Sequence, residues 1–402
     1  MSTANERLFD VSIRHAIGVQ RYTAGEVREM LIMLKKAERD LQKKLSARLV
    51  QGDWTSRRYQ TLMQDIKAMR KALFAQLHSS SRVNLLKLAK AEQQFTRGML
   101  QSALPFHIDF ATASAQTLNT LVTAQPFSGG THAAKTLGQW WTGVAAADQS
   151  RITGAIQLGM IQGESVPQMV GRVMQSQTLT RANAETVVRT AVNHVSNSSR
   201  DAFFKENSDI VEMTMWVSTL DGRTTMVCMD RDGSYDSVTG ENWDRIPEPH
   251  LDPPGAAPPA HPRCRSVKIA ILDAENLSKQ LPSRAYVRDT RTNRMRAKDF
   301  RADAREQVGK ARWKRMSVKQ RNRAITKQKK AWTAESIGHV PAKVNYEQWL
   351  RRQPASFQND VLGIAKGKAF RKGLKINQFL DKQGNELTLV QLQALFPTYI
   401  SL

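Results

Sequence analysis

The sequence predicts a mainly α-helical protein with a small α+β, proline-rich module in the middle, between a helical N-terminal bundle or hairpin and a small helical C-terminal module. Three observations predict this fold class. Apolar residues recur every three or four positions in the first hundred residues, apolar and polar residues alternate over 210–218, and seven of the 14 prolines fall within 247–262. These patterns are typical of amphipathic helices, a strand and a looped segment, respectively.

A chain of 402 residues is too long for one ordinary core. Shifts in composition predict five regions. They are a helical bundle or hairpin for assembly contacts (1–110), a helical region (111–205), a strand-turn-loop module with a Cys/His motif (206–275), a basic segment (276–335) and a small helical module (336–402).

The N-terminal region predicts three amphipathic helices. The apolar face of the first, over 24–50, consists of Val27, Met30, Leu31, Leu34, Leu41 and Leu45. The second extends from about Tyr59 to Leu77, and the third from about Val83 to Leu100. We expect the sequences QGDW at 51–54 and HSSS at 78–81 to separate them, and short connections favour antiparallel packing.

Residues 111–180 are rich in Ala, Thr, Gln and Gly and predict only short helices. Ser165 followed by Pro167 predicts a helix start, because proline is favoured in the first turn. Thr180 is expected to cap a further helix that includes the sequence VVRTAVNHVSNSSR.

The middle module predicts two strands. The alternation around Val211–Val217 indicates a half-buried strand that ends at an Asp221-Gly222 turn, and residues 266–272 indicate the strand that closes the module. The proline-rich stretch between them is expected to be an extended or looped cover.

The basic segment has the strongest charge in the chain. Residues 284–330 contain 18 Lys and Arg against 4 Asp and Glu, a net charge of +14, and are either helical or a disordered arm. The tail regains apolar residues, including Trp349, Phe357, Phe370 and Phe379, which predict a small helical core.

The net charge of +24 predicts an acidic partner, most simply nucleic acid, or else a solvated basic surface. Phosphate contacts are expected from the basic segment, through Arg312, Lys314, Arg315, Lys319, Arg321, Arg323, Lys327, Lys329 and Lys330. Two cysteines make no disulfide scaffold. The charged N-terminus predicts no signal peptide, and no window predicts a membrane span, so we expect synthesis in a reducing cytoplasm and no membrane partner.

Cys228, His261 and Cys264 are candidate zinc ligands, because Cys and His are the preferred ligands of structural zinc. His250, Asp230 or water would supply a fourth ligand. Two alternatives stay open: the cysteines are small buried apolar residues, or they form a disulfide. Arg263 and Arg265 either bind phosphate or pair with Asp230 and Asp232.

No catalytic set is evident. The sequence has no phosphate-binding glycine loop, nucleophile elbow or His-Glu-x-x-His motif. Asp221, Asp230, Asp232 and Asp236 lack the spacing of a calcium loop, and turn formation explains them more simply. We therefore predict that the protein is not an enzyme.

The stretches MWVSTLDGRTTMVCMDRDG and PPAHPRCRSVKI resemble the signature of phage head morphogenesis proteins, the minor head proteins related to the F protein of phage Mu. The matching positions are Trp216, Ser218, Thr219, Asp221, Arg223, Thr224, Cys228, Asp232, Gly233, Pro258, Pro259, His261, Pro262, Cys264 and Arg265. Arg189 and Thr190 fit the preceding helix, and the tail is similar to a C-terminal module of some relatives. Relatives often carry further cysteines where this chain has Thr225-Met226 and Ser266.

The resemblance implies a virion component that is associated with the portal protein or the major capsid protein and contacts packaged double-stranded DNA. It implies a location at the portal vertex or in the head interior, after assembly in the host cytoplasm. It also implies that the motif is a structural clasp, in which the prolines hold His261 and Cys264 against the Asp221–Cys228 turn. The alternatives are a nuclease or transferase that uses the Asp/His/Cys cluster, and a stand-alone DNA- or RNA-binding regulator.

Overall fold

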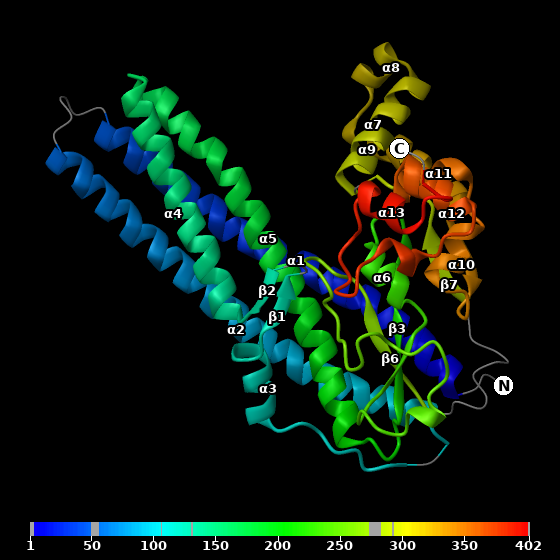
Figure 1. The fold of residues 1–402 in the computed structure, drawn as a ribbon. Helices are drawn as coiled ribbons and strands as arrows, with labels where there is room; N and C mark the ends of the chain where they lie inside the picture. The colour runs from blue at the N-terminus through cyan, green and yellow to red at the C-terminus, as the bar shows by residue number, and fades with distance from the viewer. Residues whose placement is uncertain are drawn as a thin grey trace. The chain divides into compact units, whose positions relative to one another are not determined.

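The computed structural model describes residues 4–49, 56–105, 107–129, 132–272, 283–291 and 293–400. It confirms a mainly α-helical fold with a few small sheets (Figure 1). The chain forms two compact units. The first comprises Met1–Asp10, Met213–Gly255 and Ile269–Leu402, and the second comprises Val11–Glu212 and Ala256–Lys268.

Long helices make up most of the second unit. They are α1 (Ala4–Leu49, from Val11 onward), α2 (Ser56–Ala103), α3 (Ala115–Thr123), α4 (Leu137–Ile161) and α5 (Val166–Glu206). A short antiparallel hairpin, β1 (Phe127–Gly129) and β2 (His132–Lys135), precedes α4. Helices α2, α4 and α5 pack against one another around Phe74, Leu77 and Trp141.

The predicted break at 78–81 is wrong, because α2 continues through it. Serine costs a helix only a few tenths of a kcal/mol per residue. Phe74, Leu77, Leu85 and Leu88 are all buried in one core cluster, so packing on both sides holds the HSSS stretch in the helix. The other predicted break, at 51–54, lies outside the described residues.

The start of α5 confirms the Ser165 prediction: Ser165 is its N-cap and Pro167 lies in its first turn. The predicted cap at Thr180 is wrong. Thr180 is buried in the middle of α5, and its hydroxyl donates to Asp148 Oδ1 on α4 at 2.7 Å. A partner on another helix therefore satisfies the hydroxyl that the sequence assigns to a cap.

The described residues form two three-stranded sheets. One has the order β5 (Tyr235–Ser237), β3 (Met213–Val217), β6 (Val267–Ile271), and β5 and β3 are antiparallel. The other has β4 (Leu220–Asp221) parallel to β7 (Ser283–Val287), which is antiparallel to β8 (Ile337–Pro341). Every residue of β3 is buried, so the predicted half-buried strand has both faces covered.

The prediction that residues 247–262 form a loop is confirmed, because this stretch contains no helix and no named strand. It follows α6 (Met226–Arg231) and η1 (Trp243–Arg245). The basic segment is helical, with α7 (Asn293–Val308), α8 (Lys310–Arg315) and α9 (Val318–Ser336). Arg284, counted in that segment by charge, is an exception, because it lies in β7 and is buried.

The tail forms the predicted helical module. Its elements are α10 (Tyr346–Arg351), α11 (Ala355–Leu362), α12 (Ile364–Arg371), η2 (Ile376–Phe379) and α13 (Leu389–Leu395). Trp349, Phe357, Phe370 and Phe379 are buried in one cluster with Leu220 and Met226 of the middle module. Among the described helices, none has an apolar stretch long enough to cross a bilayer.

Candidate functional site

The carboxylate of Asp232 is the centre of a buried polar cluster in the first unit. Arg284 of β7 donates to both of its oxygens, at 2.9 and 3.1 Å. The backbone N–H of Ser218 donates to Oδ1 at 2.6 Å, and that of Tyr346, the first residue of α10, donates to Oδ2 at 2.7 Å. The carboxylate is fully buried and the Arg284 side chain is 5% exposed. Four donors and the N-terminus of α10 thus compensate the desolvated negative charge.

Trp216 and Ser218 extend this cluster towards Cys228. The Trp216 indole donates to Ser218 Oγ at 2.9 Å, and Ser218 Oγ donates to the Cys228 carbonyl at 2.7 Å. Arg284 also donates to the Ser218 carbonyl. Each of these polar groups is buried and has a partner, which accounts for a Trp in β3 and a Ser directly after the strand.

The Asp221 turn is held by its own side chains. Asp221 accepts hydrogen bonds from the Arg223 backbone at 3.0 Å and the Arg223 guanidinium at 3.2 Å, and Thr224 Oγ1 donates to the Thr219 carbonyl at 2.5 Å. The Tyr346 hydroxyl donates to the Asp221 carbonyl at 2.6 Å. The turn is therefore fixed to the same C-terminal helix that binds Asp232.

Gly233 occupies a position that requires glycine. Its φ is +86°, and a Cβ there would lie 3.2 Å from Cβ of Asn345, the N-cap of α10. Its N–H donates to the Trp216 carbonyl at 2.9 Å. A side chain would be strained by both backbone conformation and crowding. Six of the predicted motif residues therefore belong to one structural cluster: Trp216, Asp221, Arg223, Thr224, Asp232 and Gly233. We call this cluster, with Ser218, Arg284 and Tyr346, the Asp232 clasp.

The HPRCR stretch lies along α5 in the second unit. The Arg263 N–H donates to Thr190 Oγ1 at 3.1 Å, and its guanidinium donates to Thr186 Oγ1 and the Ala182 carbonyl at 3.0 and 3.1 Å. Asn193 donates to the Ser266 carbonyl at 3.2 Å. The α5 segment around Arg189 and Thr190 and the HPRCR stretch, about 75 residues later, are thus joined by direct hydrogen bonds.

Residues 150–269 match the family model described as Phage Mu protein F like protein. We call residues 150–269, which are similar to this family, the Mu F-like region. This match supports the resemblance to phage head morphogenesis proteins, and the family is a structural one that is not known for enzymes. No curated protein and no solved structure gave a significant match.

In the Mu F-like region, His261 and Cys264 form a turn in which the Cys264 N–H donates to the His261 carbonyl at 3.1 Å. Pro262 lies within this turn and Arg265 follows it, and both are half-buried. His261 Nδ1 lies 2.9 Å from the Pro262 carbonyl, an acceptor only, so Nδ1 carries the hydrogen and Nε2 is the ring nitrogen with a lone pair. Burial lowers the pKa of His261, but its hydrogen bond and charge interaction with Cys264 outweigh this effect, and the net pKa is raised.

Cys228 is buried on α6 of the first unit, whereas His261 and Cys264 belong to the second. Two thiols and an imidazole are a suitable donor set for zinc. The complete three-ligand site stays a prediction. So does the expectation that the prolines hold His261 and Cys264 against the Asp221–Cys228 turn. Neither Cys228 nor Cys264 is in a disulfide, so the disulfide alternative is not borne out. The suggested ligand His250 instead has its Nε2 2.9 Å from the Ile246 carbonyl.

Three of the four acidic residues weighed as a cation site, Asp221, Asp232 and Asp236, have structural partners, whereas burial raises the pKa of the fourth, Asp230, to about 6. Asp232 pairs with Arg284, not with Arg263 or Arg265 as one alternative had it, and Asp236 accepts from the Gly255 N–H at 3.0 Å. Asp221 accepts from the backbone N–H and the guanidinium of Arg223. Carboxylates that already accept hydrogen bonds within the fold are poor candidates for a nuclease metal site, so the geometry gives no support to the enzyme alternative.

His194 of α5 is a buried histidine with a structural environment. Its ring stacks on Phe127 with centroids 5.0 Å apart, and Nδ1 lies 3.3 Å from Ser198 Oγ. Burial lowers its pKa to about 4. Since an unfolded histidine titrates near 6.5, the unfolded chain binds more protons between pH 6.5 and 4.

We therefore expect the second unit to lose stability as the pH falls through that window, by up to about 3 kcal/mol for this group. Urea unfolding at pH 7.5 and 4.5, followed by circular dichroism, measures the difference. His194→Phe keeps an aromatic ring without a titrating group, and it should remove most of the histidine contribution. An unchanged pH dependence in this variant would contradict the assignment.

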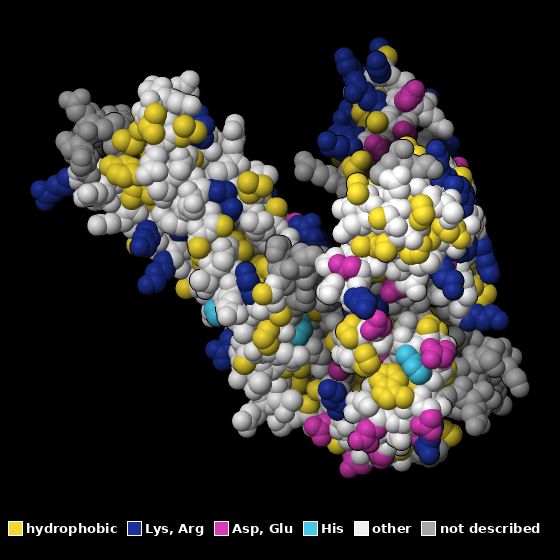
Figure 2. All heavy atoms as spheres, viewed as in Figure 1, with side chains coloured by type: hydrophobic (Ala, Val, Ile, Leu, Met, Phe, Trp, Pro, Cys, Tyr) yellow, Lys and Arg dark blue, Asp and Glu magenta, His cyan; other side chains and the backbone are white. Residues whose placement is uncertain are grey.

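The nine predicted nucleic-acid contacts lie on α8 and α9. Eight are exposed, and the exception is Arg321, which is half-buried and donates to the Trp313 and Lys314 carbonyls at 3.0 Å each. Figure 2 shows Lys and Arg side chains gathered over α7, α8 and α9. Arg321 therefore fastens α9 to α8, while the others point outward.

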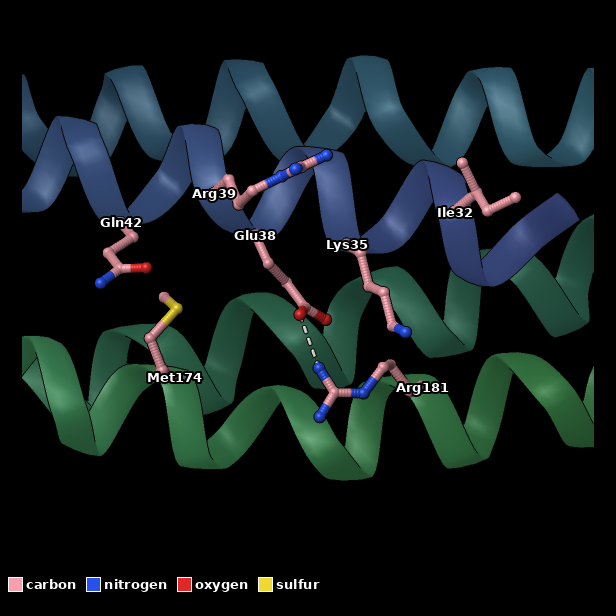
Figure 3. A pocket seen from close by; sticks show the side chains of 7 residues that line it. All are labelled: Ile32, Lys35, Glu38, Arg39, Gln42, Met174 and Arg181. Carbon is pink, nitrogen blue, oxygen red and sulfur yellow. Dashed lines mark hydrogen bonds and ion pairs between the residues drawn. The ribbon is translucent and has the colours of Figure 1, made fainter. Parts of the chain in front are cut away.

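A groove between α1 and α5 lies in the second unit (Figure 3). Its lining comprises Ile32, Lys35, Glu38, Arg39, Gln42, Met174 and Arg181. Arg181 donates to Glu38 Oε2 at 2.5 Å, bridging the two helices. Three cations against one carboxylate give this lining a positive charge, and Ile32 is 60% exposed.

Two residues of the Asp232 clasp, Arg284 and Tyr346, were not predicted from the sequence. Arg284 was counted among the cations of the basic segment, and Tyr346 was not singled out within the C-terminal module. No local signal marks either residue, because their partner Asp232 lies 52 and 114 positions away.

Proposed function

We propose that the protein is a phage minor head protein, held at the portal or the inner capsid surface, that contacts packaged double-stranded DNA. The observation that carries this proposal is the match of residues 150–269 to the Mu F-like family model, together with the hydrogen bonds that its motif residues form within the fold. We further propose that the protein has no enzymatic activity, since the Asp, Arg and Tyr groups of the clasp are engaged with one another.

The basic helices support the DNA contact. Their segment has a net charge of +14 over 284–330, and most of its cations are exposed. Lys and Arg that neutralise phosphates release counterions from DNA, which supplies affinity without sequence preference. A protein enclosed with packaged DNA needs this kind of contact. The positively charged groove between α1 and α5 suits an acidic segment of a portal or capsid protein.

Co-expression with the portal and major capsid proteins of the same phage tests the proposal. We expect the protein to sediment with assembled shells, and we expect the amount bound to fall when the portal protein is omitted if the portal holds it. Shells without the protein, at matched expression, would contradict the assignment. If the amount bound is unchanged when the portal protein is omitted, the binding partner is the capsid protein and not the portal.

We also propose that Cys228, His261 and Cys264 are ligands of a zinc ion. Elemental analysis of the purified chain is expected to give about one zinc per molecule, and Cys264→Ser should lower this content. Such a site would add stability, because metal binding is coupled to folding. A zinc-free preparation with unchanged circular dichroism would remove the metal from the account and leave the fold intact.

A further inference from the structure

Helix α9 has one face that packs and one that does not. The half-buried residues Arg321, Ala324, Ile325, Gln328 and Trp332 follow helical spacing and define the inner face. Trp332 donates to Asp289 Oδ2 at 2.7 Å and lies against Phe300 of α7, with ring centroids 5.6 Å apart. Gln328 donates to Gln307 of α7. The inner face therefore fixes how α9 is rotated about its axis.

The outer face of α9 is opposite and consists of Lys319, Asn322, Arg323, Thr326 and Lys330, all exposed. At about 100° per residue, these positions lie on the side of the helix away from the inner face. Val318, Lys319, Asn322, Arg323 and Thr326 line a shallow surface groove. The only acidic residue of α9 is Glu335, in its last turn.

The N-terminus of α9 is also fixed. Ser317 accepts from the Gln320 N–H at 3.3 Å, and the Gln320 side chain accepts from the Ser317 N–H at 2.8 Å, which completes a capping box. Arg321 ties the first turn to α8. The outer face is thus presented by a helix that is anchored along its length.

We propose that the outer face of α9 lies in the major groove of duplex DNA. This groove is about 12 Å wide and admits an α-helix. Lys and Arg at both ends of the face complement phosphates, and the Asn322 amide can donate to and accept from base edges. The Thr326 hydroxyl donates to the Asn322 carbonyl at 2.8 Å and keeps its oxygen as an acceptor for a base edge. The proposal rests on the proposed DNA contact and adds the element and the groove.

The test uses the full-length chain and two 30-base-pair duplexes of the same sequence. One duplex is unmodified, and the other carries glucosylated 5-hydroxymethylcytosine, which fills the major groove and leaves the phosphates in place. Lys319→Gln/Arg323→Gln alters the outer face. Lys298→Gln/Arg301→Gln removes the same two charge types from exposed positions on α7 and is the matched control.

We expect the chain to bind the glucosylated duplex at least tenfold more weakly than the unmodified one. The outer-face variant should lose affinity for the unmodified duplex at least tenfold, and its slope of log K against log salt should fall by about 1.8. The α7 control should stay within about twofold of the unaltered chain.

Equal binding to both duplexes, or equal losses in the two variants, would overturn the proposal and leave a diffuse basic contact. Failure of the unaltered chain to bind either duplex at low salt would instead overturn the DNA contact itself.

Discussion

Asp232→Ala is expected to destabilise the first unit by about 3–5 kcal/mol, because it leaves the Arg284 guanidinium buried without its carboxylate. The substitution also removes the acceptor of the Ser218 and Tyr346 N–H groups, so β3 and α10 lose their common anchor. Hydrogen exchange measured by mass spectrometry should show faster exchange in 213–237 and 346–351. Exchange in α2, which belongs to the second unit, should change little and is the internal reference.

Two further variants separate the charge from the shape of the side chain. Asp232→Asn keeps the size but not the charge, and it should recover only part of the protection. Arg223→Ala removes an arginine that is 35% exposed from the same motif, and it should cost less than about 1 kcal/mol. Protection in Asp232→Ala equal to that of the unaltered chain would show that the clasp does not hold the module together.

Asp148→Ala is expected to have an effect of similar size on the second unit. Arg70 of α2 is 2% exposed and donates to Asp148 Oδ2 at 2.7 Å and to Gln177 of α5 at 3.0 Å, so three helices meet at this polar layer. Removal of the carboxylate leaves a buried cation, at a cost of about 3–5 kcal/mol. Thermal unfolding followed by circular dichroism measures the loss.

The double variant Arg70→Met/Asp148→Leu is the control for this prediction. Replacement of a whole buried ion pair by apolar residues is often neutral or stabilising. We therefore expect the double variant to unfold at a higher temperature than Asp148→Ala alone. A double variant that is less stable than the single one would show that the polar layer contributes through geometry and not through charge compensation.

Periodicity was sufficient for the helices that bury an apolar face. Leu34, Leu41 and Leu45 of α1, and Trp349, Phe370 and Phe379 of the tail, are buried as their spacing predicts. The pattern was weaker for α4, which is rich in Ala and Gly. This helix is nevertheless 25 residues long, because Thr136 and Gln139 cap its start and its small side chains allow α5 to pack closely.

The candidate site was only partly predictable. The motif residues from Trp216 to Gly233 form one cluster, whereas the implied packing of His261 and Cys264 against the Asp221–Cys228 turn stays a prediction. Its charge balance depends on Arg284, and its link to the tail depends on Tyr346. Both contacts come from the tertiary fold, which brings distant segments together, and local sequence carries no record of such pairing.

The basic segment shows the opposite limit. Its charge predicts a phosphate contact, but charge alone does not distinguish a disordered arm from helices. In α9, the residues that pack alternate with exposed cations; they are Arg321, Ile325, Gln328 and Trp332. This spacing identifies the inner face of α9 only once the contacts of Gln328 and Trp332 with α7 are known.

Mass spectrometry of purified phage heads tests the central claim most directly. The protein should be present in few copies per head, in both DNA-free procapsids and DNA-filled heads, and ultraviolet irradiation of filled heads should cross-link peptides from 310–330 to DNA. Absence of the protein from both kinds of particle, with the protein detected in the host cell lysate, would contradict its assignment as a head component.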